Sequence, residues 1–291
     1  MRLPDKTTTL EEAVAQIGDG ATVMVGGFGV PGTPFTLIRE LVRQGPKHLT
    51  IIKNDANEKG MGIDHLLAAG QVDRLVTSHI GLNPRAVEML NAGRLEVEFN
   101  PQGILAERIR AGGAGLGGIL TDIAAETELT RGKKRVELDG REYVVETALR
   151  ADVALIHADR ADTFGNLDYV ATAQNFNPLM AMAAPVVIAE AERVLPLGGL
   201  APDDVHTPGP LRRPPGGTQR DQRGIRRCPT LGNAWSPAAR EIAPGMVVNL
   251  GIGLPTRWST ISPPTSRSAC TPRTASRASA PRCSPRRPTA T

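Results

Sequence analysis

A run of glycines and prolines near the N-terminus has the composition of a ligand-binding turn. Residues 21–25 are apolar and β-prone, and residues 35–42 have helical spacing. The turn between them contains Gly26, Gly27, Phe28, Gly29, Val30, Pro31 and Gly32. Glycine permits positive φ and close approach of a ligand to the backbone, and amides at a helix start favour an anionic or carbonyl group. The segment therefore predicts a ligand-binding turn, although a tight βα turn that binds nothing has the same local pattern.

Further polar positions follow predicted strands. Asn54 comes directly after the run 49–53, and Gln102 and Gly103 come shortly after the run 95–99. The ligand crevice of a parallel sheet opens at the carboxyl ends of its strands. These three residues are therefore candidates for a cleft, with an Asx turn as the alternative for Asn54.

Two asparagines and a glycine-rich stretch have plainer interpretations. Asn175 and Asn177 stand at the start of a helical segment, so we expect helix caps rather than ligand contacts. Residues 112–118 (GGAGLGG) fit either a mobile loop near the cleft or a packed turn.

The titratable residues suggest no catalytic or metal-binding cluster. Glu58 is expected to be a solvated loop charge, and His65, His79 and His206 are expected to be surface or packing residues. No group of His, Cys, Asp and Glu has metal-ligand spacing. We therefore expect no metal and assign no catalytic residue.

Alternating strands and helices must position the candidate residues. Apolar runs predict strands at 21–25, 49–53, 74–78, 95–99, 152–157 and 185–189, and helical periodicity predicts helices at 10–17, 34–43, 62–69, 84–91 and 103–110. This alternation predicts an α/β fold with a parallel-dominated sheet and flanking helices. Residues 133–147 alternate around Asp139-Gly140, which predicts a side β-hairpin on the main sheet.

The excess of basic over acidic residues is confined to two segments. The formal net charge is +4, but residues 210–231 carry six Arg and one Asp, and residues 257–291 carry seven Arg and no acid. The remaining residues are therefore acidic, which argues against a nucleic-acid partner. No apolar run is long enough to cross a bilayer, and the N-terminus does not have the pattern of a signal peptide. We expect a cytoplasmic protein with no membrane partner.

Many separate segments match the motifs of one family in the same order. They are DGATVMVGGFGVPGTP at 19–34, NDAN at 54–57, SHIGLNP at 78–84, PQGILAERIRAGGAGLGGILT at 101–121, LRADVALIHADRADTFGNLDY at 149–169, ATAQNFNPLMAMAA at 171–184 and DDVHTPG at 203–209. Together they resemble the α part of family I coenzyme A transferases, in particular the acetate/acetoacetate type. Residues 239–256 (AREIAPGMVVNLGIGLPT) resemble the start of the partner β part, with Gly251 and Gly253 in its first glycine loop.

The resemblance implies four regions. Residues 1–209 would form a CoA-transferase α-type domain, 210–231 an aberrant linker, 232–256 the start of a β-type domain, and 257–291 a tail. The tail is rich in Arg, Ser, Thr, Pro and Ala and lacks Gly, Asp and Glu, so we predict that it is disordered. Out-of-frame reading of GC-rich DNA gives the same composition, and we prefer this frameshift to a genuine basic tail.

The resemblance also implies a reaction. Members of the family move CoA between a short-chain acyl-CoA (acetyl-, acetoacetyl- or succinyl-CoA) and a small carboxylate or 3-oxoacid through a glutamyl-CoA intermediate. The CoA thioester is a substrate, no cofactor is bound, and Gly26–Gly32 would contact CoA. The glutamate belongs to a Glu-Asn-Gly motif of the β part, and no Glu-Asn-Gly occurs in this sequence. The chain would therefore need a β subunit in a hetero-oligomer, and an inactive remnant or a non-catalytic CoA-binding α subunit is the alternative.

Overall fold

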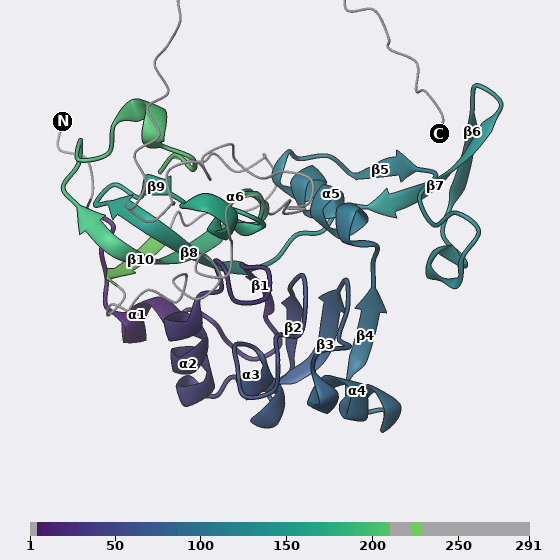
Figure 1. Ribbon diagram of the computed structural model, residues 1–291, viewed down its shortest axis with the longest axis horizontal. Coiled ribbons are helices and arrows are strands. Elements are labelled where there is room, and N and C mark those ends of the chain that lie inside the picture. Colours follow the sequence, from purple (N-terminus) through teal and green to yellow (C-terminus); the bar gives the residue numbers. More distant parts are fainter. Residues whose placement is uncertain (1–4, 210–222, 228–291) are drawn as a thin grey trace, which may run out of the picture. The chain divides into compact units, whose positions relative to one another are not determined.

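A mostly parallel sheet forms the centre of the fold (Figure 1). The computed structural model describes residues 5–209 and 223–227. The strand order is β11 (Arg223–Arg227), β10 (Val186–Leu195), β8 (Val153–Asp162), β1 (Thr22–Val25), β2 (Leu49–Ile52), β3 (Val72–Thr77) and β4 (Glu96–Phe99), and β9 (Leu167–Asp168) pairs with β8. Neighbours in this order are parallel, whereas β9 is antiparallel to β8. The predicted parallel-dominated α/β fold is confirmed.

Helices cover both faces of the sheet because the strands between them alternate apolar side chains toward two cores. The helices are α1 (Leu10–Val14), α2 (Phe35–Gln44), α3 (Asp64–Ala68), α4 (Pro84–Asn91), α5 (Gln102–Gly113) and α6 (Asn177–Ala183). Val23 and Val25 of β1 belong to the core that includes α1 to α4. Met24, between them, belongs to the core that includes α5 and α6. Successive side chains of β1 therefore point to opposite faces of the sheet, and each face packs against its own layer of helices.

The predicted hairpin forms, but it does not lie on the main sheet. β6 (Arg135–Leu138) and β7 (Arg141–Thr147) flank Asp139 and Gly140, whose φ angles of 51° and 72° suit a tight hairpin turn. β5 (Gly118–Thr121) pairs with the other edge of β7 to complete a separate three-stranded antiparallel sheet. The expected attachment to the main sheet was wrong because β7 pairs with β5 instead.

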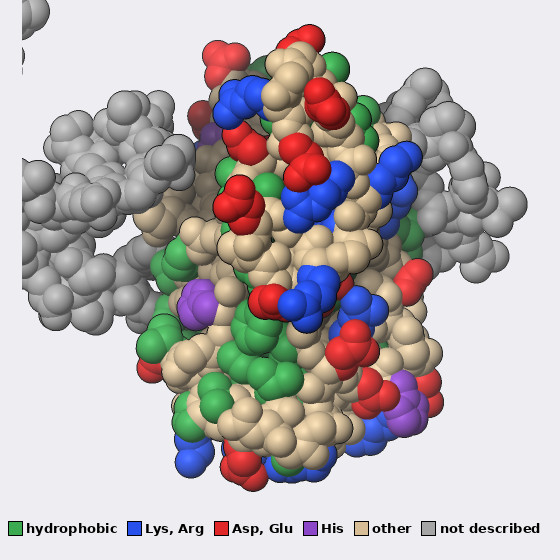
Figure 2. All heavy atoms as spheres, turned by 90° about the vertical axis from the view of Figure 1, so that its right-hand side faces the viewer, with side chains coloured by type: hydrophobic (Ala, Val, Ile, Leu, Met, Phe, Trp, Pro, Cys, Tyr) green, Lys and Arg blue, Asp and Glu red, His purple; other side chains and the backbone are tan. Residues whose placement is uncertain are grey.

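Figure 2 views the molecule from the side that carries this small sheet. Acidic and basic side chains are interspersed over the visible face, and apolar side chains gather below them. The small sheet and its neighbouring loop contain two ion pairs, Arg135–Glu142 and Arg141–Asp122. This face therefore presents no large surface of a single charge.

Other predicted elements lie within a few residues of their observed positions, with two informative differences. The strands predicted at 152–157 and 185–189 extend to Asp162 and Leu195 because β8 and β10 pair with each other along their whole length. Within the region expected to be an aberrant linker, β11 pairs in parallel with β10. The proposed β-type start at 232–256, with Gly251 and Gly253, and the tail at 257–291 lie outside the described residues.

Candidate functional site

The glycine loop, residues 26–32, lies where the order of the parallel strands reverses. From β1 the chain adds β2, β3 and β4 on one side and later returns to place β8 and β10 on the other. The loop leaves the carboxyl end of β1, and the Gly26 N–H donates to the Leu155 oxygen of β8 at 2.8 Å. Ligands of doubly wound sheets bind at such a reversal. The topology therefore marks this loop as a candidate site.

Three of the loop glycines occupy backbone conformations that disfavour other residues. The φ angles are 97° at Gly27, 59° at Gly29 and 70° at Gly32. A Cβ at Gly27 would also lie 2.6 Å from the Thr33 backbone nitrogen, whereas a Cβ at Gly29 would meet nothing within 4 Å. Gly27 is therefore required by both its conformation and the surrounding space, but Gly29 by its conformation alone.

Asn175 and Asn177 hold one side of the glycine loop. Asn177 is fully buried, its Nδ2 donates to the Gly32 oxygen at 3.0 Å, and its Oδ1 accepts the His157 N–H at 3.1 Å. Asn175 Nδ2 donates to the Pro31 oxygen at 2.9 Å. The expectation of helix caps was wrong, because α6 has no side-chain cap and both amides are taken up by the loop.

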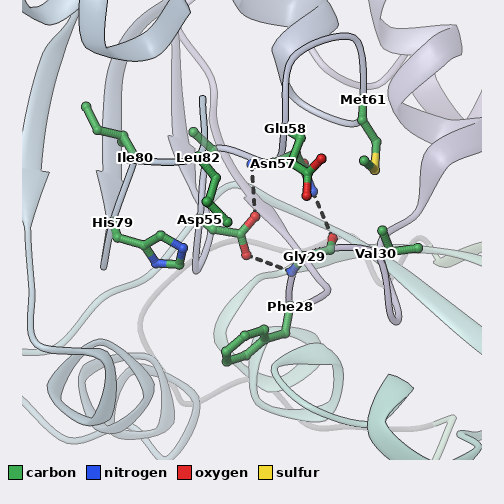
Figure 3. A pocket seen from close by; sticks show the side chains of 11 residues that line it. Phe28, Gly29, Val30, Asp55, Asn57, Glu58, Met61, His79, Ile80 and Leu82 are labelled. Carbon is green, nitrogen blue, oxygen red and sulfur yellow. Dashed lines mark hydrogen bonds between the residues drawn. The ribbon is translucent and has the colours of Figure 1, made fainter. Parts of the chain in front are cut away.

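A second segment, residues 54–57, holds the other side (Figure 3). The Gly29 N–H donates to Asp55 Oδ2 at 2.8 Å, and Asn57 Nδ2 donates to the Gly29 oxygen at 2.8 Å. Asp55 Oδ1 also accepts the Asn57 N–H at 2.9 Å. Both polar groups of the Gly29 backbone are therefore bonded to one short turn after β2.

A buried ion pair lies beneath this turn. Lys53 is completely buried, and its Nζ lies 3.4 Å from Asp55 Oδ1. Burial lowers the pKa of Lys53, and the attraction of Asp55 opposes that change. Burial raises the pKa of Asp55, but the charge of Lys53 and the hydrogen bonds from Gly29, Asn57 and Asn54 outweigh it, so the pKa is below its usual value. Asp55 is therefore held as a carboxylate with its oxygens already engaged.

The remaining cleft candidates have different environments. Asn54 is completely buried, its Oδ1 accepts a hydrogen bond from Gln102 Nε2 at 2.9 Å, and the same oxygen lies 3.1 Å from Ser78 Oγ. Gln102 and Gly103 are exposed at the start of α5. The structure thus joins Asn54 and Gln102 by a hydrogen bond, but none of the three lines the pocket beside the glycine loop.

That pocket is formed by the glycine loop and two further chain segments, residues 55–61 and 79–82 (Figure 3). Its lining residues are Phe28, Gly29, Val30, Asp55, Ala56, Asn57, Glu58, Met61, His79, Ile80 and Leu82. Phe28 and Leu82 are 45% and 65% exposed, so apolar side chains form an open rim. His79 and Glu58, which we expected to be surface or packing residues and a solvated charge, lie at this pocket.

Sequence reasoning singled out the glycine loop but not most of its surroundings. Asp55, Asn57, Ile80 and Leu82 were not named as site residues, although they belong to the segments 54–57 and 78–84 that carry the resemblance. Their motifs were the available signal. Their contacts with residues 28–30 depend on the pairing of β1 with β2, which no local pattern specifies.

The glycines at 112–118 form packed backbone contacts at three positions. A Cβ at Gly112 would lie 1.8 Å from the Leu149 oxygen, and one at Gly118 would lie 2.4 Å from the Glu146 oxygen. A Cβ at Gly113 would lie 2.6 Å from Met182 Cβ. These contacts agree with the packed-turn alternative and give the glycines a structural role.

The chemistry available at the pocket is that of an apolar surface beside a shaped backbone. Within residues 5–209 no group of three His, Cys, Asp or Glu side chains is placed to hold a metal ion. No helix in the described part of the chain has the length and apolar content needed to span a bilayer. The arrangement can therefore bind and orient a ligand with an apolar portion at the loop.

Comparisons with known proteins identify the family. The sequence pattern described as coenzyme A transferase matches residues 7–213. The alpha chain of a probable coenzyme A transferase from Bacillus subtilis is 49% identical over 205 residues, covering 70% of this chain and 90% of the relative. One of the chains of a succinyl-CoA:3-ketoacid coenzyme A transferase from Xanthomonas campestris pv. campestris is 50% identical over 193 residues, covering 66% of this chain and 80% of the relative.

A solved structure agrees with this relationship. An acyl-CoA transferase from Escherichia coli O157:H7, in a thioester complex with CoA, superposes with a TM-score of 0.65 at 25% sequence identity. The match covers 77% of this chain and 47% of that chain, so this chain spans less than half of that protein. By its sequence and its fold, the chain belongs to the coenzyme A transferase family and is similar to the α subunits of its members.

Proposed function

We propose that this chain is the α-type half of a short-chain acyl-CoA transferase. The enzyme would move CoA between acetyl-, acetoacetyl- or succinyl-CoA and a small carboxylate or 3-oxoacid. The observation that carries the proposal is the glycine loop, whose Gly29 backbone is fixed by Asp55 and Asn57 and whose Gly32 oxygen is fixed by Asn177. The loop's glycines have no side chains and let a thioester approach the backbone, and groups fixed in advance cost no reorganisation during reaction.

The nucleophile in this proposal comes from a β-type part. A glutamate carboxylate attacks the thioester carbonyl, CoA thiolate leaves, and a mixed anhydride forms. The thiolate then attacks the glutamyl carbonyl and releases the donor carboxylate, which leaves a glutamyl-CoA thioester. The acceptor carboxylate reverses these steps to give its own acyl-CoA and the free glutamate.

The buried carboxylate at the pocket is unsuited to the role of nucleophile. Asp55 is 5% exposed, and its oxygens accept hydrogen bonds from Gly29, Asn54 and Asn57 and pair with Lys53. A carboxylate so engaged is a poor nucleophile. Because the sequence contains no Glu-Asn-Gly, we expect the chain alone to bind CoA without turning it over.

Two measurements on the full chain test the proposal. Calorimetry should detect CoA binding, and exchange between acetoacetyl-CoA and acetate should require an added intact CoA-transferase β subunit. CoA binding without restored turnover would favour the alternative, an inactive remnant or a non-catalytic CoA-binding subunit. Clear turnover by the chain alone would refute the proposed division of labour, and Glu58→Gln would then be the first variant to assay. Absence of CoA binding would refute the proposal for the loop.

A further inference from the structure

The pocket beside the glycine loop is apolar over most of its wall. Phe28 and Val30 come from the loop itself, Met61 from the turn before α3, and Ile80 and Leu82 from the segment after β3. In Figure 3 the Phe28, Val30, Met61 and Leu82 side chains surround the Gly29 backbone from different sides. Such a wall fits a short hydrocarbon chain better than a charged group.

Charges at the pocket are unevenly balanced. Lys and Arg are absent from the lining residues, whereas Asp55 and Glu58 are present. The charge of Asp55 is paired with buried Lys53. Glu58 has no ion-pair partner among the described residues, and the adjacent Lys59 does not line the pocket. The pocket therefore carries one unpaired negative charge at its exposed edge.

Two further polar side chains, Asn57 and His79, line the pocket, and His79 is bound to a neighbouring hydroxyl. His79 Nδ1 lies 3.1 Å from Ser78 Oγ, and Ser78 Oγ in turn donates a hydrogen bond to the backbone oxygen of Asn54 at 2.6 Å. This arrangement ties the imidazole to a neutral hydroxyl. A ligand carboxylate in the pocket would meet the Glu58 charge with no Lys or Arg among the lining residues to offset it, and like charges brought together oppose binding.

From this balance we infer that the pocket takes the acyl chain of a short, uncharged acyl-CoA and that Glu58 discriminates against acyl chains ending in a carboxylate. The inference rests on the proposed function and narrows it. Acetyl, butyryl and acetoacetyl groups bring no charge toward Glu58, whereas a succinyl group would bring its free carboxylate toward the Glu58 carboxylate. Specificity of this kind comes from a repulsive element as much as from attraction.

Two small amides test the pocket without requiring turnover. Butyramide and succinamate share a four-carbon chain and a carbonyl in place of the thioester, but succinamate ends in a carboxylate. Ligand-observed NMR on the full chain should show butyramide binding about tenfold tighter than succinamate. Glu58→Gln should reduce that ratio about fivefold or more, by improving succinamate binding and leaving butyramide binding nearly unchanged. Glu88→Gln, which removes a 75% exposed carboxylate on α4, should leave the ratio unchanged.

The inference would be overturned by equal binding of the two amides, by a ratio unaffected by Glu58→Gln, or by no binding of butyramide. Displacement of butyramide by pantetheine, which carries no acyl group on its sulfur, would assign the pocket to the arm of CoA and would also overturn the inference. CoA calorimetry on the same samples tests the proposed function separately, so a chain that binds CoA but shows no preference refutes only the acyl-chain assignment.

Discussion

Glu190 offers the sharpest test of the packing between β10 and the start of α2, the helix that follows the glycine loop. This β10 side chain is 1% exposed, and its Oε2 accepts the Leu37 N–H near the start of α2 at 2.9 Å. Burial raises the pKa of Glu190 to about 8, against the hydrogen bonds from Leu37 and Thr36. The charge of Glu192 adds to the rise and that of Arg39 opposes it. The folded chain therefore keeps a proton on Glu190 near neutral pH.

The direction in which pH changes the stability follows from the pKa of Glu190 in the unfolded and the folded chain. The unfolded chain releases this proton near 4.5, whereas the folded chain releases it near about 8. Between about pH 6 and about pH 7.5 the folded state binds about one more proton than the unfolded state. As the pH rises through this range, Glu190 therefore lowers the free energy of unfolding by about 1.4 kcal/mol per pH unit. Its stabilising contribution is complete below the unfolded pKa and is lost as the pH rises through about 8, about 5 kcal/mol in all.

Urea unfolding of the wild type and of Glu190→Gln across this pH range measures the effect. Glutamine keeps an oxygen for the Leu37 amide but does not ionise, so the stability of the variant relative to the wild type should rise by about 1.4 kcal/mol per pH unit. Glu107→Gln, which replaces a 47% exposed carboxyl on α5, is the control and should show no such trend.

Other titrating groups do not obscure the comparison. The lowered pKa of buried Lys53 makes stability rise with pH, opposite to Glu190, but Lys53 is present in every variant and cancels in the difference. A stability difference between Glu190→Gln and the wild type that does not change with pH would refute the reasoning. It would mean that the carboxyl is solvated in the folded chain.

Two further predictions concern the loop and its supports, and a third concerns an ion pair between α5 and β4. Gly27→Ala should lower the free energy of unfolding, measured by thermal unfolding, by more than about 2 kcal/mol, because a Cβ there meets the Thr33 backbone. Gly29→Ala should lower it by about 1 kcal/mol, from its positive φ alone, and equal losses would contradict the geometry. Asn177→Ala should cost about 2 to 3 kcal/mol and weaken CoA binding, because it leaves the Gly32 oxygen without this donor; unchanged calorimetry would remove Asn177 from the site. Arg108→Met should cost about 3 to 5 kcal/mol in urea unfolding, because this buried guanidinium pairs with Glu98 at 2.5 Å; a loss below about 1 kcal/mol would show that the pair contributes little.

The order of strands and helices could be predicted because it depends on local patterns. Apolar runs ending in glycine gave β1 and the turn after it, and the periodic run after residue 34 gave α2. The small sheet could be predicted only in part. The Asp139-Gly140 turn is a local signal for the hairpin, but β5 is four residues long and its pairing with β7 joins Gly118 to Thr147. No pattern within either segment specifies that distant partner.

The candidate site, like the small sheet, could be predicted only in part. Glycine marks a backbone that needs unusual φ, so the loop is visible in sequence. Its supports are not, because an asparagine before a helix has the same local pattern whether it caps the helix or reaches elsewhere. Asn177 binds the Gly32 oxygen 145 residues away, and Asp55 binds the Gly29 amide 26 residues away. Both contacts arise from the order of β2, β1 and β8, which only the assembled sheet provides.

The positions of these supports bear on how the chain would act with a partner. Asp55 and Asn57 follow β2, and Asn175 and Asn177 lie at the start of α6, so residues on both sides of β1 hold the loop. All four belong to the α-type region, and none depends on a second chain. A loop fixed in this way pays its ordering cost when the chain folds rather than when substrate binds. In the proposed enzyme, an α-type chain without its partner would therefore lack the nucleophile but keep the shape of its half of the site, and for that reason addition of the β subunit should restore turnover.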